Sequence, residues 1–246
     1  MDEAPSSPKR RRGIYLLPNL FTTAALFAGF YAITAAINHR FELAAVAIFI
    51  AMILDGMDGR VARLTNTQSA FGAEYDSMAD LTSFGIAPAI VLYIWSLSSL
   101  GKLGWVAAFV HAAGAALRLA RFNTQVATAD KRYFQGLPSP SAAAILAGFL
   151  WFGLEQDFSG ESLRHVALAL SMLTGLLMVS NFRYYSFKDV DLRGRIPFVR
   201  VILMMLAFGV IFTNPPLMLF VLFTAYAISG PVVTLLMRKR RRERRS

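Results

Sequence analysis

The sequence contains no cysteine among its 246 residues and is poor in charged residues, which make up 16% of the chain. The absence of cysteine excludes disulfide bonds, zinc–thiolate sites and thiol nucleophiles. The shortage of charge, together with 56% hydrophobic residues, excludes an ordinary soluble domain and is typical of a polytopic membrane protein. No linker-like segment divides the chain, and we therefore expect a single domain.

Long apolar segments follow one another along most of the chain, and a transmembrane helix needs about 20 such residues. We expect an all-α, polytopic membrane bundle of about eight helices over residues 16–237, between basic tails at 1–15 and 238–246. The fifth and seventh segments are short enough to be tilted or only partly spanning. The expected segments are 16–37, 43–64, 71–98, 103–124, 139–154, 165–181, 199–213 and 216–237.

Acidic residues are also scarce, with 15 Asp and Glu against 25 Lys and Arg. Of these basic residues, 22 lie in the two tails and in every second connection, and only Arg40, Lys102 and Arg164 lie in the others. The positive-inside rule then predicts that both termini are cytoplasmic. We expect the basic tails to lie on anionic lipid headgroups of the bilayer. Because no nucleic-acid motif accompanies them, we expect no nucleic-acid partner.

Four aspartates stand out in the apolar background of the second and third segments. Residues at i, i+3, i+4 and i+7 share one face of a helix, and both segments place two carboxylates and two small residues at such spacings. These faces consist of Asp55, Asp58, Gly59 and Ala62 on one helix and of Gly72, Asp76, Asp80 and Ser83 on the other.

Four carboxylates gathered around one point require cations to offset their repulsion. Oxygen ligands without His or Cys favour Mg²⁺ or Mn²⁺, with Ca²⁺ as a further option, and they suffice to bridge two ions. Gly59, Ala62 and Gly72 leave room for a phosphorylated ligand against the backbone, and Arg63 is placed to contact phosphate.

Two other interpretations of the aspartates stay open at this point. Small residues also serve close helix packing in membranes, with the aspartates paired to Arg60 and Arg63. A cation-coupled transporter also uses acidic clusters, but near mid-membrane on broken helices, whereas this cluster is expected close to the cytoplasmic ends.

The spacing Asp-x2-Asp-Gly-x2-Ala-Arg-x8-Gly-x3-Asp-x3-Asp resembles the signature of the CDP-alcohol phosphotransferase family at every specified position. The resemblance implies that the first three aspartates bind divalent metals that engage the diphosphate of a CDP-linked lipid. It implies that Asp80 touches the metal site and acts as general base on the incoming alcohol, and that CMP leaves. The residues expected to bind the lipid substrate, CDP-diacylglycerol, are Asp55, Asp58, Gly59, Ala62, Arg63 and Gly72.

Further segments narrow the resemblance to membrane-embedded bacterial members of that family whose acceptor alcohol is L-serine. These segments are DLTSFGIAPA (80–89), RLARFN (118–123), DKRYFQGLPSP (130–140) and SNFRYYSFKD (180–189). The resemblance implies that phosphatidylserine and CMP form at the bacterial inner membrane, in a site that faces the cytoplasm. Glycerol 3-phosphate or an inositol phosphate remains an alternative acceptor.

A serine site needs a cation for the carboxylate of the substrate, ideally an arginine. The candidates are Arg118, Arg121, Asn123 and Arg183, and each Arg is equally open to interpretation as a positive-inside anchor. Arg118 is the strongest, because it falls within an apolar run where a charge needs a partner. Asn19 and Thr22 either line the mouth of the site or cap the first helix. None of the three histidines is assigned to catalysis, and the small-residue faces permit a homodimer.

Overall fold

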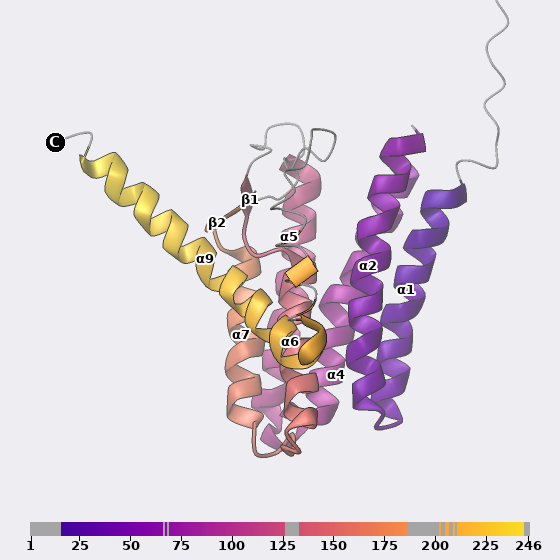
Figure 1. Ribbon diagram of the computed structural model, residues 1–246, viewed down its shortest axis with the longest axis vertical. Helices are drawn as coiled ribbons and strands as arrows, with labels where there is room; N and C mark the ends of the chain where they lie inside the picture. The colour runs from indigo at the N-terminus through magenta and orange to yellow at the C-terminus, as the bar shows by residue number, and fades with distance from the viewer. Residues whose placement is uncertain are drawn as a thin grey trace, which may run out of the picture.

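The computed structural model of the chain describes residues 16–65, 67, 69–125, 133–185, 202, 205–206, 209 and 211–243. Helices dominate this part of the chain (Figure 1). The α-helices are α1 (Leu16–Ile37), α2 (Phe41–Thr65), α3 (Ala70–Asp80), α4 (Ala87–Trp95), α5 (Lys102–Gln125), α6 (Ser139–Glu155), α7 (Arg164–Val179) and α9 (Pro215–Glu243). A π turn at Leu81–Ile86 joins α3 to α4, a 3-10 turn spans Leu97–Leu100, and two short strands are β1 (Tyr133–Gln135) and β2 (Arg183–Tyr185).

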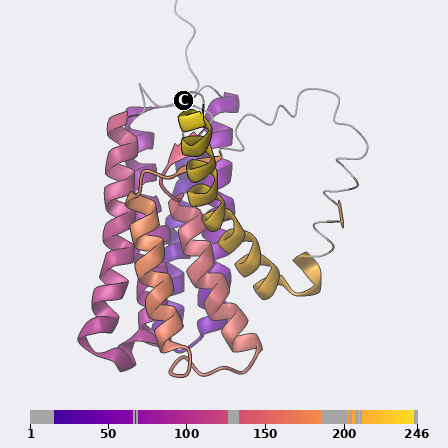
Figure 2. The same cartoon turned by 90° about the vertical axis from the view of Figure 1, so that its left-hand side faces the viewer.

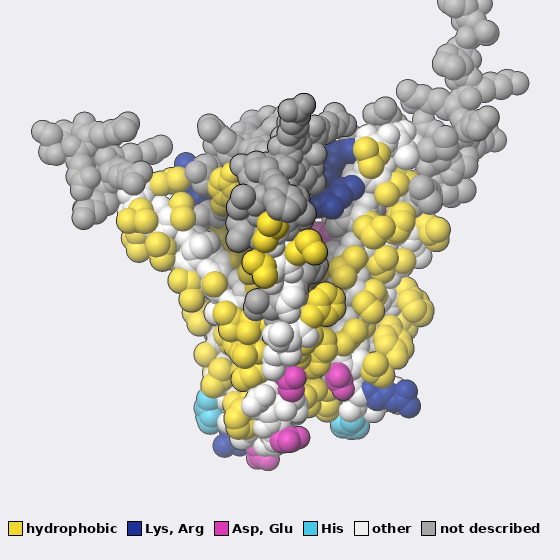
Figure 3. Space-filling view, viewed as in Figure 1, with side chains coloured by type: hydrophobic (Ala, Val, Ile, Leu, Met, Phe, Trp, Pro, Cys, Tyr) yellow, Lys and Arg dark blue, Asp and Glu magenta, His cyan; other side chains and the backbone are white. Residues whose placement is uncertain are grey.

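The long helices stand side by side in a bundle, and α9 leans away from it across one side (Figures 1 and 2). The α1–α2, α4–α5 and α6–α7 connections lie together at one end of the bundle. The start of α1, the end of α9 and both strands lie toward the other end. Acidic and histidine side chains gather at the end that carries the three connections (Figure 3). Alternate connections therefore share an end, as the charge pattern predicts.

Helix α6 forms the centre of the bundle. Every residue from Ser141 to Leu150 is buried, and the helix packs against α2, α4, α7 and α9. A helix that is apolar on all sides is expected to be buried in this way. Helices α1 and α2 pack closely through small side chains, which let the two backbones approach each other. The buried alanines of these two helices in the main core are Ala28, Ala32, Ala35, Ala36, Ala44, Ala45, Ala47 and Ala51.

The expected helix at 71–98 is interrupted and ends earlier. Its α-helical hydrogen bonds widen into the π turn, where the Ala87 N–H donates to the Thr82 carbonyl, five residues back. Pro88 follows at once; it has no N–H, and its ring crowds the carbonyl four residues earlier. The widened turn accommodates this proline, and the helix closes at Trp95.

Among the described residues, four helical spans are long and apolar enough to cross a membrane: Pro18–Ile37, Ala70–Trp95, Lys102–Thr124 and Pro215–Met237. Helix α6 has 17 residues and, at 1.5 Å per residue, is about 25 Å long. An arrangement with eight spans therefore stays a prediction. The expected segment 199–213 falls largely outside the described residues.

The prediction of an all-α fold missed the small sheet. Strands β1 and β2 pair antiparallel, with Phe134 opposite Tyr184. Tyr184 is fully buried, and its hydroxyl donates a 3.0 Å hydrogen bond to the carbonyl of Ala227 in α9. That carbonyl lacks its usual partner because Pro231, four residues later, has no N–H. Burial raises the pKa of the Tyr184 hydroxyl, which keeps it a donor. The sheet thus holds α9 against the bundle.

Candidate active site

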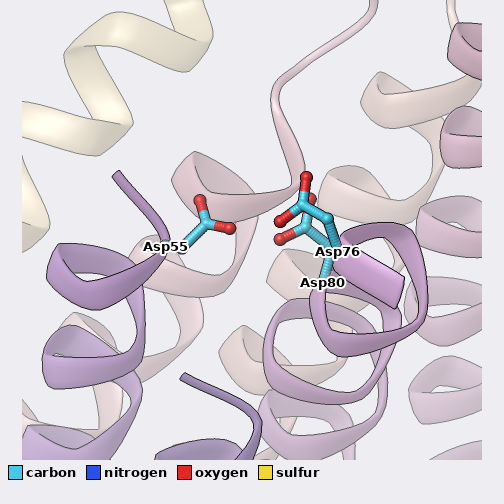
Figure 4. A group of neighbouring side chains, drawn as sticks. All are labelled: Asp55, Asp76 and Asp80. Atoms are coloured by element: carbon cyan, nitrogen blue, oxygen red, sulfur yellow. The ribbon is translucent and has the colours of Figure 1, made fainter. Parts of the chain in front are cut away.

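Three of the four aspartates converge between α2 and α3. One carboxylate oxygen of each of Asp55, Asp76 and Asp80 lies within 4.8 Å of the others. Asp55 projects from α2 toward Asp76 and Asp80, which project from α3 (Figure 4). The i, i+4 spacing places the latter two on one helix face. The structure therefore brings the two predicted faces together at these three residues.

Helix α3 is positioned by its first and last turns. Ser69 is the N-cap, and its hydroxyl oxygen accepts a 3.0 Å hydrogen bond from the Gly72 N–H, which satisfies one of the free amides of the first turn. At the other end, α3 stops at Asp80 and the π turn begins at the next residue. Asp80 thus lies at the junction of two helical geometries.

The fourth aspartate, Asp58, makes a different contact. It is buried, and one of its oxygens accepts a 2.8 Å hydrogen bond from the hydroxyl of Thr22 in α1. Its carboxylate also interacts with that of Asp76. Asp58 therefore adjoins the cluster of three on the α1 side without sharing its common point. Of the two options for Thr22, a place in the site is the one that this contact favours.

The cluster of three has the properties of a divalent-metal site. Asp76 Oδ1 and Asp80 Oδ1 are buried and find no hydrogen-bond partner among the described residues. Buried polar atoms without a partner are uncommon in folded proteins and call for a ligand or an ion. Carboxylate oxygens are the ligands that Mg²⁺ and Mn²⁺ prefer. The residues present therefore fit such an ion.

The small residues of the motif differ in what surrounds them. Among the described residues, a side-chain carbon added at Gly59 would meet only the Arg63 guanidinium, at 4.0 Å, so no described residue covers that face of α2. At Gly72 the added carbon would lie 3.1 Å from Ser69 Oγ and 3.4 Å from Asn19 Oδ1. Position 72 thus requires a small residue partly because the cap residue Ser69 and Asn19 of α1 lie so close to it. Ala62 is half-buried.

Among the candidate serine ligands, Arg118 lies deepest in the site. Its Nη1 atom donates a 2.9 Å hydrogen bond to the Ser139 hydroxyl at the start of α6. Its Nε atom is buried without a partner among the described residues. Asp80 and Tyr226 are the charged and polar groups that act on its guanidinium electrostatically. The sequence predicts a partner for the charge of Arg118, and Asp80 of the aspartate cluster provides part of it.

The other three candidates lie farther out. Arg121 Nη1 donates to Asn181 Oδ1 at 3.2 Å and more weakly to the Ser180 carbonyl at 3.4 Å, at the end of α7. Asn123 Nδ2 donates to Ser77 Oγ at 3.0 Å, which joins the end of α5 to α3 beside Asp76. Arg183 is exposed in β2, where its backbone N–H donates to Thr234 Oγ1.

Sequence patterns marked the segment 136–140 as the turn that opens a helix, but they did not connect Ser139 with Arg118 or Tyr226 with this region. Ser139 follows the turn Gly136–Pro138 and starts α6, and no local feature connects it with Arg118. Tyr226 belongs to a segment without any motif. Both approach the site only through the packing of α6 and α9.

The fold and the site together define a helical membrane protein with an acidic, metal-type centre formed by two neighbouring helices. A profile of the CDP-alcohol phosphatidyltransferase family matches residues 15–180. The chain is 37% identical over 217 residues to a CDP-diacylglycerol–serine O-phosphatidyltransferase of Helicobacter pylori, covering 88% of this chain and 90% of that protein.

Proteins with the same name from two other organisms are similar over shorter lengths. The Mycobacterium tuberculosis protein is 44% identical over 151 residues, covering 58% of this chain and 52% of its own length. The Saccharomyces cerevisiae protein is 38% identical over 139 residues, covering 51% and 50%. The chain belongs to the CDP-alcohol phosphatidyltransferase family.

Proposed function

We propose that this chain is a CDP-diacylglycerol–serine O-phosphatidyltransferase, which transfers a phosphatidyl group to the hydroxyl of L-serine and releases CMP. The observation that carries the proposal is the convergence of Asp55, Asp76 and Asp80 within a motif of eight specified residues. The similarity to the Helicobacter pylori protein, which extends over nine-tenths of both chains, supports serine as the acceptor. Family membership also argues against the transporter alternative.

The aspartates and the face of α2 that carries Gly59 hold the lipid substrate in this proposal. Asp55, Asp58, Asp76 and Asp80 would hold two Mg²⁺ or Mn²⁺ ions. When bound there, these ions would neutralise the diphosphate and stabilise the charge that develops at phosphorus. Gly59 leaves the helix surface free for the CDP group, and Arg63 lies beside it to contact phosphate.

Asp80 acts as general base on serine. The serine Oγ forms a bond to the phosphorus that carries diacylglycerol, the bond from that phosphorus to the CMP oxygen breaks, and the serine hydroxyl proton passes to Asp80. The buried Oδ1 of Asp80 has no hydrogen-bond partner among the described residues. Because a carboxylate has about four lone-pair sites, Asp80 can contact an ion with one of them and accept this proton with another.

Arg118 binds the serine carboxylate in this arrangement. Its unpaired Nε offers a donor, and the N–H groups of a guanidinium suit a planar carboxylate. Because Asp80 acts on the same guanidinium, a carboxylate held by Arg118 brings serine next to the base. Arg121, Asn123 and Arg183 remain outer candidates for the same substrate.

The bundle lies in the bacterial inner membrane with both termini and the aspartates toward the cytoplasm. The support for this orientation is the charge distribution along the sequence, in which 22 of the 25 Lys and Arg residues lie in the two tails and in every second connection. CDP-diacylglycerol then reaches the site from within the bilayer, and serine reaches it from the cytosol.

The direct test supplies purified protein in detergent with CDP-diacylglycerol, labelled serine and Mn²⁺ or Mg²⁺. Labelled phosphatidylserine and CMP are expected to appear in equal amounts, and to disappear when a chelator removes the metal. Turnover with glycerol 3-phosphate or an inositol phosphate, and none with serine, would overturn the acceptor and leave the family assignment intact.

A further inference from the structure

His111 is a fully buried side chain of α5 that the proposed reaction does not use. Its Nε2 lies 3.1 Å from the carbonyl oxygen of Phe84 in the π turn. Its Nδ1 lies 2.8 Å from the hydroxyl oxygen of Thr174 in α7. Since a carbonyl only accepts, Nε2 is the donor, and in the neutral ring Nδ1 accepts the Thr174 hydroxyl hydrogen. The imidazole thus connects α7 to the π turn.

The Phe84 carbonyl needs this donor for a reason that is local to the sequence. In a continuous α-helix it would accept a hydrogen bond from the residue four positions later, which is Pro88 and has no N–H. A buried carbonyl without a partner is costly. The imidazole supplies a donor to this carbonyl while the Ala87 N–H is bonded to the Thr82 carbonyl, so both contacts belong to the widened turn.

The face of α5 that carries His111 lies along the π turn and extends to Asp80. His111, Ala115 and Arg118 are spaced i, i+4 and i+7 and so share one helix face. A side-chain carbon added at Gly85 would lie 2.9 Å from Ala115 Cβ, which shows how closely α5 approaches the turn. Arg118 lies on this stripe at the level where its charge acts on Asp80. One stripe of α5 therefore contacts the turn and reaches the proposed base.

We propose that His111 is a positioning residue for Asp80, which holds the π turn open so that the carboxylates of α3 face Asp55. A π turn adds one residue to a helical turn, and each residue rotates a helix by about 100°. Closing the turn would therefore rotate α3 relative to α4 and turn Asp76 and Asp80 away from α2. The proposal rests on the role of Asp80 given above.

Two substitutions separate the two hydrogen bonds of the imidazole. The amide of His111→Gln reaches the place of Nε2 and keeps a donor for Phe84, whereas that of His111→Asn takes the place of Nδ1 and keeps the contact with Thr174. We expect His111→Asn to lower kcat at least tenfold, since misplacement of a reacting group by about 1 Å has effects of that size or larger. We expect the kcat of His111→Gln to stay within about threefold of wild type, and neither variant to change the KM for serine by more than about threefold.

Ser171→Ala is the matched control. Ser171 is also buried, and its hydroxyl donates a 2.9 Å hydrogen bond to the Ala107 carbonyl, in the same α5–α7 contact and one turn away from His111. This variant is expected to lose thermal stability and to keep its kcat. Equal losses of kcat in Ser171→Ala and His111→Asn would overturn the proposal, because they would assign the effect to helix packing in general.

The absence of cysteine allows a measurement that does not depend on activity. Leu64 at the end of α2 and Met78 in α3 are 75% and 67% exposed, so Leu64→Cys and Met78→Cys can carry a pair of spin labels. The distance distribution between the labels is expected to be shifted or broadened by His111→Asn and preserved by His111→Gln. An unchanged distribution in a folded His111→Asn variant would overturn the proposal even if Asp80 proved not to be the base.

Pro88→Ala provides a second test if the histidine variants do not fold. The new N–H competes with His111 for the Phe84 carbonyl, so the turn can close into an α-helix. The expected result is an unchanged or raised unfolding temperature together with a kcat that falls at least tenfold. Wild-type kcat in this variant, with an unchanged label distance, would overturn the proposal.

Discussion

The carboxylates of the motif are costly side chains for an apolar bundle. An aspartate near the centre of a membrane helix costs about 2.5–3.5 kcal/mol on insertion scales, and here three of them place oxygens within 4.8 Å of one another. For the fourth aspartate, Asp58, the hydrogen bond from the Thr22 hydroxyl offsets part of the cost of burial. The unpaired oxygens of Asp76 and Asp80 are explained by a bound cation, and this requirement makes single substitutions informative.

Asp80→Asn is expected to abolish turnover while CDP-diacylglycerol still binds. The amide keeps the size of the side chain but cannot accept the serine proton, and general-base catalysis contributes about 10²–10⁴-fold to such rates. The measurement is kcat with labelled serine, beside equilibrium binding of the lipid. Residual activity above a tenth of wild type would contradict the general-base role.

Arg118→Met is expected to raise the KM for serine by about tenfold or more, with a small change in the KM for the lipid. Methionine keeps the apolar stem of the side chain but removes the guanidinium donors that the serine carboxylate needs. Arg183→Met is the matched comparison, because Arg183 is exposed in β2 and lies farther out. A serine KM that changes in Arg183→Met and stays constant in Arg118→Met would reverse the assignment.

In the described part of the chain, two helices contain an internal proline whose freed carbonyl receives a donor from another element. In the α3–α4 helix the Phe84 carbonyl accepts from His111, and in α9 the Ala227 carbonyl accepts from Tyr184. Buried backbone groups are almost always paired. A proline inside a buried helix leaves the carbonyl four residues earlier without its N–H donor, and a side chain of a neighbouring element can supply one. These contacts join elements that are distant in the sequence.

Tyr184→Phe is expected to destabilise the protein by about 1 kcal/mol, the usual net contribution of one hydrogen bond. The effect should be smaller in a Pro231→Ala background, where the new N–H of α9 can satisfy the Ala227 carbonyl. Thermal unfolding in detergent of the four proteins of this double-mutant cycle measures the coupling. Equal destabilisation in both backgrounds would show that the ring packing, and not the hydroxyl, holds α9.

At the scale of the molecule, the bundle has two chemically different ends. The end with the three connections carries acidic and histidine side chains (Figure 3), and the aspartate cluster belongs to the half in which α2 ends and α3 begins. In a membrane we expect this polarity to set the orientation, because the positive-inside rule places basic residues on the cytoplasmic side.

Single cysteines in the cysteine-free chain test this orientation. Thr124→Cys lies in the last turn of α5, on the side of the chain termini, and Gln156→Cys follows α6 at the opposite end; both positions are exposed. A membrane-impermeant maleimide is expected to label Gln156→Cys in intact spheroplasts and Thr124→Cys only after lysis. The unsubstituted chain is the control for background labelling, and the reverse pattern would contradict a cytoplasmic site.

Much of the fold could be anticipated because helix formation is a local property. The apolar segments matched α1, α2, α5, α6 and α7 in place and nearly in length, whereas α9 begins as expected but continues to Glu243, into the segment predicted to be a basic tail. The i, i+3, i+4 spacing correctly placed Asp76 and Asp80 on one face, since 3.6 residues per turn leave no other outcome for a straight helix. The interrupted 71–98 helix and the β1–β2 sheet were missed, because proline accommodation and strand pairing depend on neighbours that no sequence window contains.

By itself the sequence determined the class of protein, the helices, the alternation of charge between their connections and the eight motif residues, all of which follow from composition and short-range spacing. Only the tertiary structure decided which side chains meet. Thr22 lies 36 positions from Asp58, His111 lies 27 positions from Phe84, and Ser139 lies 21 positions from Arg118. Such contacts arise from the way helices pack and widen at a proline, and they place the proposed base, its positioning residue and the candidate serine ligand within one site.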